Sequence, residues 1–288
     1  MIGKTIKVIP VLAIFFLASC QKTVNDDALT VRLSIQDQSV KTSLGGLSGG
    51  QYPVLWSEGD VVVLNGVSSS ALSSDEASSA TATFRFKGSI TAPYNFLYCG
   101  VSGKDNEVSF SGVQTLAVGN IPSCSLPMYA ASLNLNSITM NHLGAVLKFA
   151  FTGTETISQI KISSLGGESL AGNFSMSKNA SGLLDVATFA PSGSNTSTVM
   201  LDGNAVLSDT ATEFLVVVPA GTYSSGFYGQ IIASDGKIME VYFNTKDHKT
   251  LSRAVLYNFG QSVFVPTGKV ALAVSSTENF TKDTVSYE

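Results

Sequence analysis

The stretch Ala145-Val-Leu-Lys-Phe-Ala-Phe151 decides the fold of this 288-residue chain. Its residues at positions 145, 147, 149 and 151 are all apolar and fall on one face, whereas Lys148 lies on the other. An apolar residue at every second position is typical of a β-strand with a buried face. The stretch therefore predicts a strand, and the same period recurs on both sides of it.

The flanking sequence supplies more strands of the same kind. Leu29 to Ile35 alternates apolar and polar residues, and so do Phe227 to Ala233 and Ile238 to Phe243. The last two flank Asp235-Gly236, a pair that is a strong signal for a tight β-hairpin. Residues 111–137 read as irregular because their prolines limit regular strand pairing. No window shows a sustained helical period with caps.

These short strands with turns between them predict an all-β protein built from sandwiches. One sandwich needs about 100 residues. We therefore expect two in tandem, an N-terminal one over 28–138 and a C-terminal one over 139–267. A tail over 268–288 follows, in which Val270, Leu272 and Val274 alternate with other residues. The tail is interpreted either as a donor strand or as a polar extension.

The N-terminus has the layout of a secretory signal peptide. Lys4 and Lys7 precede an apolar run that is shorter than the ~20 residues of a spanning helix. The run ends in Leu17-Ala-Ser-Cys20, which resembles the bacterial lipoprotein box. This resemblance implies cleavage before Cys20 and acylation of that residue. Residues 1–19 are then the signal peptide and residues 20–27 a polar tether. An ordinary secretory site with a chance cysteine is the alternative.

Composition and cysteine spacing argue against nucleic-acid binding and against a zinc site. Charged residues make up 13% of the chain, and the net charge is −4, which gives no electrostatic footprint for nucleic acid. The low charge and the many Ser, Thr and Gly residues are typical of exported β proteins. Cys99 and Cys124 remain besides Cys20, either as a disulfide or as two partly buried thiols. Their spacing does not indicate a zinc site.

The sequence does not predict an enzyme. The chain has two histidines, His142 and His248, and neither lies in a recognisable catalytic motif. There is no phosphate-binding loop, dinucleotide fingerprint or calcium loop, so we expect no cofactor and no metal. Trp56 has two interpretations: a platform for stacking a sugar, or, favoured by its place just before a strand, a core residue.

Several motifs, in order, resemble the fimbrillin-like proteins of the Bacteroidetes, the type V pilin superfamily. They lie between residues 28 and 265. The matching segments are Lys41-Thr42, Trp56-Ser-Glu-Gly-Asp60-Val-Val-Val, Gln114, Leu126-Pro-Met-Tyr-Ala-Ala131, Asn141-His-Leu-Gly-Ala-Val-Leu-Lys-Phe149, Ile157 to Ile162, and Arg253 to Gly260.

The resemblance implies two transthyretin-like, Greek-key β-sandwich domains and a non-catalytic role in fimbriae. Polymerising members travel to the outer membrane as lipoproteins. A protease then cuts after an arginine and removes the first strand, and the groove accepts a strand from the next subunit. The partners would be other fimbrial subunits or further copies of this chain, and Leu29 to Ile35 fits the removable strand.

Two departures from the family pattern concern this processing step. Arg32 lies inside the alternating strand, and the exposed position before Thr42 is Lys41 rather than arginine. We therefore favour retention of the lipid at Cys20. The leading prediction is a surface-exposed fimbrillin-type lipoprotein of the outer membrane, acting as a subunit, tip, accessory component or anchor. The alternative is a non-polymerising surface lipoprotein that binds a glycan or a host ligand.

Overall fold

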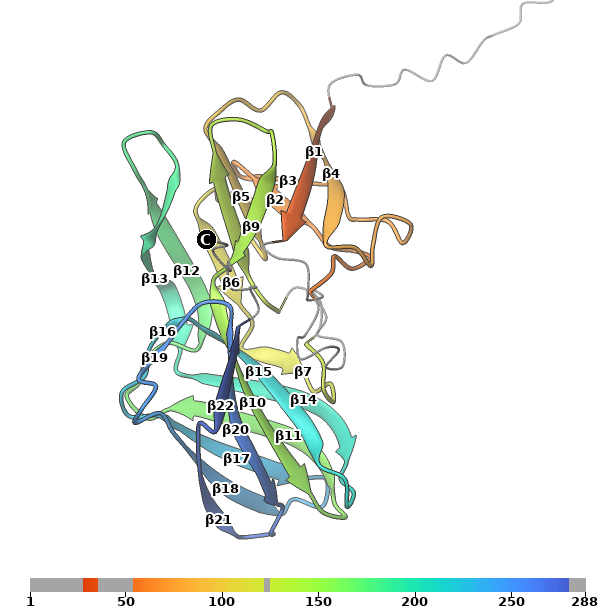
Figure 1. The fold of residues 1–288 in the computed structure, drawn as a ribbon, viewed down its shortest axis with the longest axis vertical. Coiled ribbons are helices and arrows are strands. Elements are labelled where there is room, and N and C mark those ends of the chain that lie inside the picture. Colours follow the sequence, from red (N-terminus) through yellow and green to blue (C-terminus); the bar gives the residue numbers. More distant parts are fainter. Residues whose placement is uncertain (1–27, 36–53, 122–124, 280–288) are drawn as a thin grey trace, which may run out of the picture.

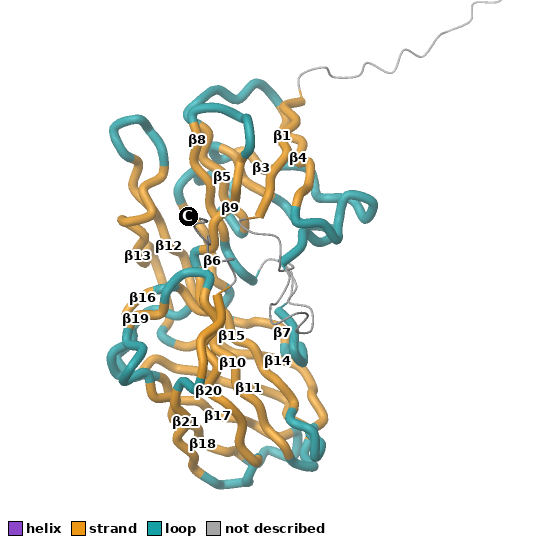
Figure 2. The backbone as a smooth tube through the Cα atoms, viewed as in Figure 1, coloured by secondary structure: helices purple, strands orange, loops and turns teal. Residues whose placement is uncertain are grey.

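The computed structural model describes residues 28–35, 54–121 and 125–279. Within these ranges the chain forms strands and loops only (Figure 2), which confirms the predicted all-β class. None of the described segments is a helix long and apolar enough to cross a membrane.

The described residues form twenty-two strands. Their bounds are β1 Ala28–Ile35, β2 Val62–Leu64, β3 Val67–Ser68, β4 Thr81–Lys87, β5 Tyr94–Tyr98, β6 Glu107–Phe110, β7 Val113–Thr115, β8 Met128–Ser132, β9 Ile138–His142, β10 Gly144–Thr152, β11 Thr156–Ser164, β12 Ala171–Lys178, β13 Leu184–Thr196, β14 Thr198–Val206, β15 Thr212–Pro219, β16 Gly221–Thr222, β17 Phe227–Ala233, β18 Ile238–Asn244, β19 Thr250–Leu251, β20 Val255–Val263, β21 Lys269–Ala273 and β22 Ser276–Asn279.

The strands gather into an upper and a lower layered body (Figure 1). The upper body contains a seven-stranded sheet in the order β3-β2-β5-β8-β9-β1-β4. The lower body packs a four-stranded sheet, β15-β10-β20-β22, against a six-stranded sheet, β21-β18-β17-β11-β14-β7. Two smaller sheets, β13-β12-β6 and β16-β19, complete the set.

Two clusters of buried apolar side chains lie inside these bodies. The N-terminal core is built mainly from residues 31–143 and the C-terminal core mainly from residues 145–264. The four-stranded sheet contributes to both, because Val146 and Val217 belong to the N-terminal core and Leu147 and Val216 to the C-terminal core. The sequence of Ala145 to Phe151 predicts a strand with one buried face. In the structure both faces of this strand are buried, one in each core.

Two elements cross between the halves of the chain. The hairpin of β12 and β13 extends from the C-terminal half and pairs through β12 with β6, with Phe174 opposite Val108. In the other direction, β7 leaves the N-terminal half and pairs in parallel with β14, with Gln114 opposite Leu201. The hairpin stands beside β5, β6 and β9 in Figure 1. These two pairings join the two halves of the chain by backbone hydrogen bonds.

Two sequence expectations need correction or detail. Residues 111–137, predicted to be irregular, contain β7 and β8, and β8 pairs with β5 along its whole length from Met128 to Ser132. Pro127 directly precedes β8 and so does not interrupt its ladder, whereas Pro122 lies outside the described residues. The hairpin predicted at Asp235-Gly236 is confirmed, with β17 paired to β18 and Gly236 at a φ of 84°.

Candidate functional site: the first strand and its slot

Strand β1 lies between β4 and β9 inside the seven-stranded sheet (Figure 1). It runs antiparallel to β4, with Ala28 opposite Lys87 and Ser34 opposite Thr81. Its last three residues run parallel to β9, where Leu33 pairs with Ile138. We call the space that β1 fills between these neighbours the slot.

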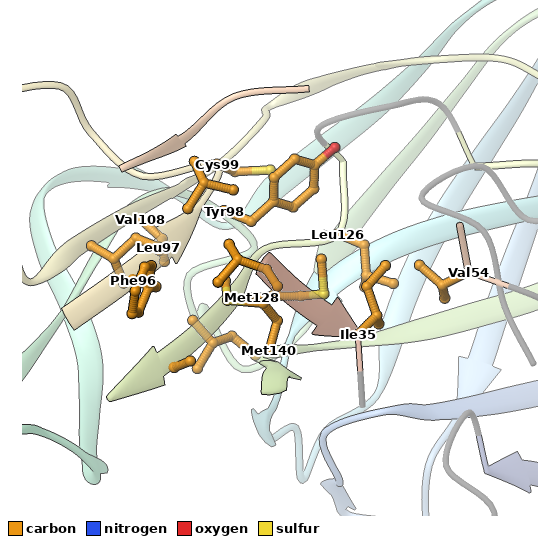
Figure 3. Packing of buried hydrophobic residues seen from close by; sticks show 14 of the residues in the cluster. Ile35, Val54, Phe96, Leu97, Tyr98, Cys99, Val108, Leu126, Met128 and Met140 are labelled. Carbon is orange, nitrogen blue, oxygen red and sulfur yellow. The ribbon is translucent and has the colours of Figure 1, made fainter. Parts of the chain in front are cut away.

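The burial of β1 follows its sequence alternation. Val31, Leu33 and Ile35 are 2%, 0% and 2% exposed, whereas Thr30 and Arg32 are exposed. Figure 3 shows Ile35 among the apolar side chains of the N-terminal core that include Leu126. The slot therefore offers three successive apolar sites at alternate positions, flanked by the main-chain groups of two strands. These are the two features that recognise an extended segment.

The slot also determines whether β4 stays attached to the sheet. In the described part of the chain, β1 is the ladder partner of β4. The remaining backbone links of β4 are the isolated bridge between Phe86 and Ser69 and the hydrogen bond from Ser70 N to Arg85 O. Loss of β1 would therefore leave β4 almost detached, with unpaired edges on both sides of an apolar groove.

Arg32 occupies the middle of β1. Its side chain is exposed, but its backbone lies opposite Thr83 of β4. A protease binds its substrate in an extended, accessible form, so cleavage after Arg32 requires β1 to leave the sheet first. Lys41, the other position predicted for processing, and Cys20, the predicted lipid site, lie outside the described residues.

Trp56 is a core residue and not a sugar platform. Its side chain is 0% exposed and packs edge-to-face against Phe84 and Tyr98, with ring centroids 4.9 Å and 5.4 Å away. A sugar needs an open aromatic face for stacking, so this burial overturns the glycan-stacking interpretation. The indole N–H has no hydrogen-bond partner among the described residues, contrary to the usual pattern for a buried tryptophan.

Asp60, in the Trp-Ser-Glu-Gly-Asp motif, organises the loop beside Trp56. The Tyr98 hydroxyl donates to Asp60 Oδ1 at 2.7 Å, and the Ser57 amide donates to Asp60 Oδ2 at 2.7 Å. The carboxyl is 2% exposed, so these charge-assisted bonds offset part of the cost of its burial. The motif thus positions the start of β2, and its role is structural.

Two buried amide side chains tie the halves of the chain together, a role that sequence reasoning missed. Gln114 Nε2 donates to Val217 O at 2.8 Å and Val217 N donates to Gln114 Oε1 at 3.0 Å. Asn95 Nδ2 donates to Gly182 O at 3.0 Å, and Leu184 N donates to Asn95 Oδ1 at 3.0 Å. Each side chain thus pairs with backbone as another strand would.

His142 lies at the end of β9 and is 2% exposed. Burial lowers the pKa of His142 to about 4 from an ordinary 6.5. Cys99 is also buried and directly follows β5, whereas Cys124 lies outside the described residues. In the described ranges no three His, Cys, Asp or Glu side chains gather closely enough to hold a metal ion.

The burial of His142 makes stability depend on pH. Between pH 6.5 and about 4 the unfolded chain binds a proton at His142 that the folded chain excludes. The free energy of unfolding should therefore fall by about 2–3 kcal/mol as pH drops through this window, at 1.36 kcal/mol per pKa unit. Urea unfolding of wild type and His142→Gln at pH 7 and pH 4.5 measures this contribution.

His248, which lies in a polar loop, supplies the matched control for that measurement. His248→Gln should keep the full pH dependence, whereas His142→Gln should have a smaller one. Equal pH dependence in all three proteins would show that His142 does not carry the effect.

The C-terminal segment folds onto the C-terminal half of the chain. Strand β21 pairs in parallel with β18, with Val270 opposite Val241 and Leu272 opposite Phe243. Strand β22 pairs with β20, with Asn279 opposite Val255. The alternating residues expected in a donor strand thus pack against the C-terminal core of the same chain.

Comparison with known proteins gives likenesses of structure alone. No family model matches the chain, and no curated protein matches its sequence. A "putative cell adhesion protein" from Bacteroides uniformis is 13% identical with a TM-score of 0.47, covering 88% of this chain and 99% of that one. One so described from Bacteroides ovatus is 10% identical with a TM-score of 0.46, covering 88% and 98%.

A third likeness is to the tip fimbrial protein of Porphyromonas gingivalis with a C-terminal truncation. It is 11% identical with a TM-score of 0.35, covering 87% of this chain and 97% of that one. The sequence identities of these three likenesses lie between 10% and 13%.

Proposed function

We propose that this chain is a fimbrillin-type surface lipoprotein, a structural and adhesive component of fimbriae that assembles by strand exchange between a strand of one subunit and the vacated slot of another. The observation that carries the proposal is β1 itself. It is a short strand whose backbone pairs with two other strands while three of its apolar side chains fill sites in the N-terminal core. A segment of another subunit with the same alternation would satisfy both the main chain and the apolar sites.

The protection of the Arg32 backbone from a protease supports an attachment of the protein to the membrane. While β1 remains in the slot, this chain offers no groove to a neighbour and can only donate a strand. The pairing of the β1 backbone with β4 at Arg32 opposes cleavage after that residue. A lipid at Cys20 would then stay attached through β1 and hold the protein on the outer membrane, where two or more acyl chains give stable binding. This combination describes an anchor or accessory subunit.

The donor segment would be the C-terminal tail. Strand β21 lies at the edge of its sheet and pairs only with β18 among the described strands, and its Val270 and Leu272 are half-buried rather than fully buried. An edge strand of five residues with partial burial is easier to release than a central strand. We infer that β21 exchanges its place on β18 for the slot of a neighbouring subunit.

The N-terminus of the protein as found on cells tests this proposal. We expect mass spectrometry of surface-extracted protein to find an acylated Cys20 with β1 present, in complexes larger than a monomer. A start beyond Ile35 would instead indicate a polymerised subunit whose first strand has been removed. Recovery solely as an unacylated, soluble monomer that never enters larger complexes would contradict the proposal.

The second candidate function is a non-polymerising surface lipoprotein that binds a glycan or host ligand. The observation that favours it is a cleft of about 570 Å³ bordered by Tyr129 and Arg253, between the two halves of the chain. The two candidates differ in whether the chain assembles, whereas ligand binding at this cleft is compatible with either.

A further inference from the structure

A groove runs between the β8–β9 pair, the β12–β13 hairpin and the segment around β19. One part encloses about 570 Å³ and includes Phe189 and Arg253, and the other encloses about 310 Å³ and includes Asn179. Tyr129 and Asn141 line both parts, so the two adjoin. Figure 1 shows the hairpin standing beside β9 above β16 and β19. An elongated groove of this kind suits a short chain of linked units.

The floor and one wall of the groove combine aromatic and amide side chains. Tyr129 and Asn141 are a cross-strand pair on β8 and β9, and both are partly exposed. Phe189 of β13 forms the wall and is held by stacking against Phe174, with ring centroids 5.4 Å apart. Partly exposed aromatic rings beside an amide can stack a sugar ring and hydrogen-bond its hydroxyls.

The charge of the groove comes from Arg253. No Asp or Glu is among the residues that line either part. Arg253 is exposed, and it forms none of the ion pairs between described residues. A guanidinium presents a planar fork of donors that fits a carboxylate at two points. The groove therefore offers a cation to an anionic ligand without a competing carboxylate.

The segment that carries Arg253 is rigidly held. The Ser252 amide donates to the Tyr257 hydroxyl at 2.7 Å, and that hydroxyl donates to Thr250 O at 3.4 Å. Ala254 has a φ of 59°, a left-handed conformation that residues with a β-carbon rarely adopt, and its amide donates to Gly144 O at 2.9 Å. Such strain persists where the surroundings impose it and gathers at functional sites.

We propose that this groove binds a sugar chain carrying a carboxylate, such as a uronic or sialic acid. Arg253 receives the carboxylate, Tyr129 and Phe189 contact the sugar ring, and Asn141 hydrogen-bonds its hydroxyls. This assignment rests on the second candidate function, for which it names the class of ligand, and it is independent of assembly through the slot. The groove is complete with β1 in place, so its binding can be measured on the intact chain whether or not strand exchange occurs.

Calorimetric titration of the intact chain with trigalacturonate, its methyl ester, 3′-sialyllactose and lactose tests the proposal. At least one acidic sugar should bind at least about tenfold more tightly than its neutral counterpart, and added salt should weaken it. The stronger of the two acids identifies the source of the carboxylate. Equal affinity for acidic and neutral sugars, or no saturable binding of either acid, would overturn the proposal.

Substitutions locate the binding site. Arg253→Ala should weaken the acidic sugar at least about tenfold, and Arg253→Lys should lie between that variant and wild type because it keeps charge but not the planar fork. Lys104→Ala removes an exposed cation that lines neither part of the groove and should leave affinity unchanged. Unchanged binding in Arg253→Ala, with an unaltered melting temperature, would overturn the assignment. Tighter binding of a hexaglutamate peptide than of any sugar would refute a saccharide ligand.

Discussion

A chain that begins after Ile35 is expected to lose most of the stability of its N-terminal half and to associate. Three buried side chains leave with β1, and burial of each contributes about 1.5–3 kcal/mol. The loss of about 5–9 kcal/mol matches the whole stability of an ordinary domain. The slot then exposes apolar surface and two strand edges, which pair with other chains. Thermal unfolding and light scattering would record both effects.

A synthetic peptide of residues 28–35 should reverse them. Added in excess, it should restore the melting temperature and return the truncated chain to a monomer, because it supplies the same side chains to the same sites. The same peptide with Leu33→Asp should fail, since Leu33 is fully buried. A chain that begins at Ala28, which retains β1, is the matched control and should behave like the intact protein.

Stability and monomeric behaviour that survive removal of β1 would contradict this prediction. So would equal rescue by the two peptides, because rescue would then not depend on the alternate apolar sites of the slot.

Gln114→Ala is expected to lower the free energy of unfolding by about 2–6 kcal/mol. The substitution removes two hydrogen bonds to Val217 and leaves a buried amide and a buried carbonyl unpaired, at about 1–3 kcal/mol each. Gln114→Glu should be at least as damaging. A carboxylate can accept from the Val217 amide but cannot donate to the carbonyl, and the site is 3% exposed.

Urea unfolding measures this effect, with Gln230→Ala as the control. Gln230 lies half-buried in β17, which pairs with β11 and β18 of the C-terminal half. Its substitution should change stability by about 0.5 kcal/mol or less, as most surface changes do. A comparable small effect for Gln114→Ala would show that this amide does not hold β15 against β7.

The sequence allowed β1 to be predicted because a strand with one buried face has a period of two. Its side chains at 31, 33 and 35 are fully buried as that period requires. The same reasoning was less informative at Ala145 to Phe151. There both faces of the strand are buried. The alternation therefore predicts that a strand forms, but it does not predict that the strand lies between two cores.

The contacts that join the halves could not be predicted from local pattern. Gln114 and Val217 are 103 residues apart, and an amide in a short strand gives no signal that it pairs with a distant backbone. The crossing of β12 to β6 is equally invisible, because Phe174 and Val108 become neighbours only when the hairpin reaches the other half. Trp56 was open to two interpretations because burial depends on Phe84 and Tyr98, both distant in sequence.

A reversible lock on β1 offers the most direct test of assembly through the slot. Ser34 and Thr81 are directly paired across β1 and β4, and such pairs lie at a Cα separation of about 4.5–5.5 Å, which a disulfide can bridge. Cysteines at both positions, with Cys20 and Cys124 replaced by serine, would tie β1 into the slot. A specific protease site inserted between Ile35 and Val54 would allow β1 to be cut from the rest of the chain.

Light scattering of the cut protein, before and after reduction, gives the measurement. If the slot is the surface for assembly, the oxidised protein remains monomeric and the reduced protein forms multimers as β1 leaves and other strands enter. Multimers of equal size under both conditions, or monomers under both, would contradict assembly through the slot.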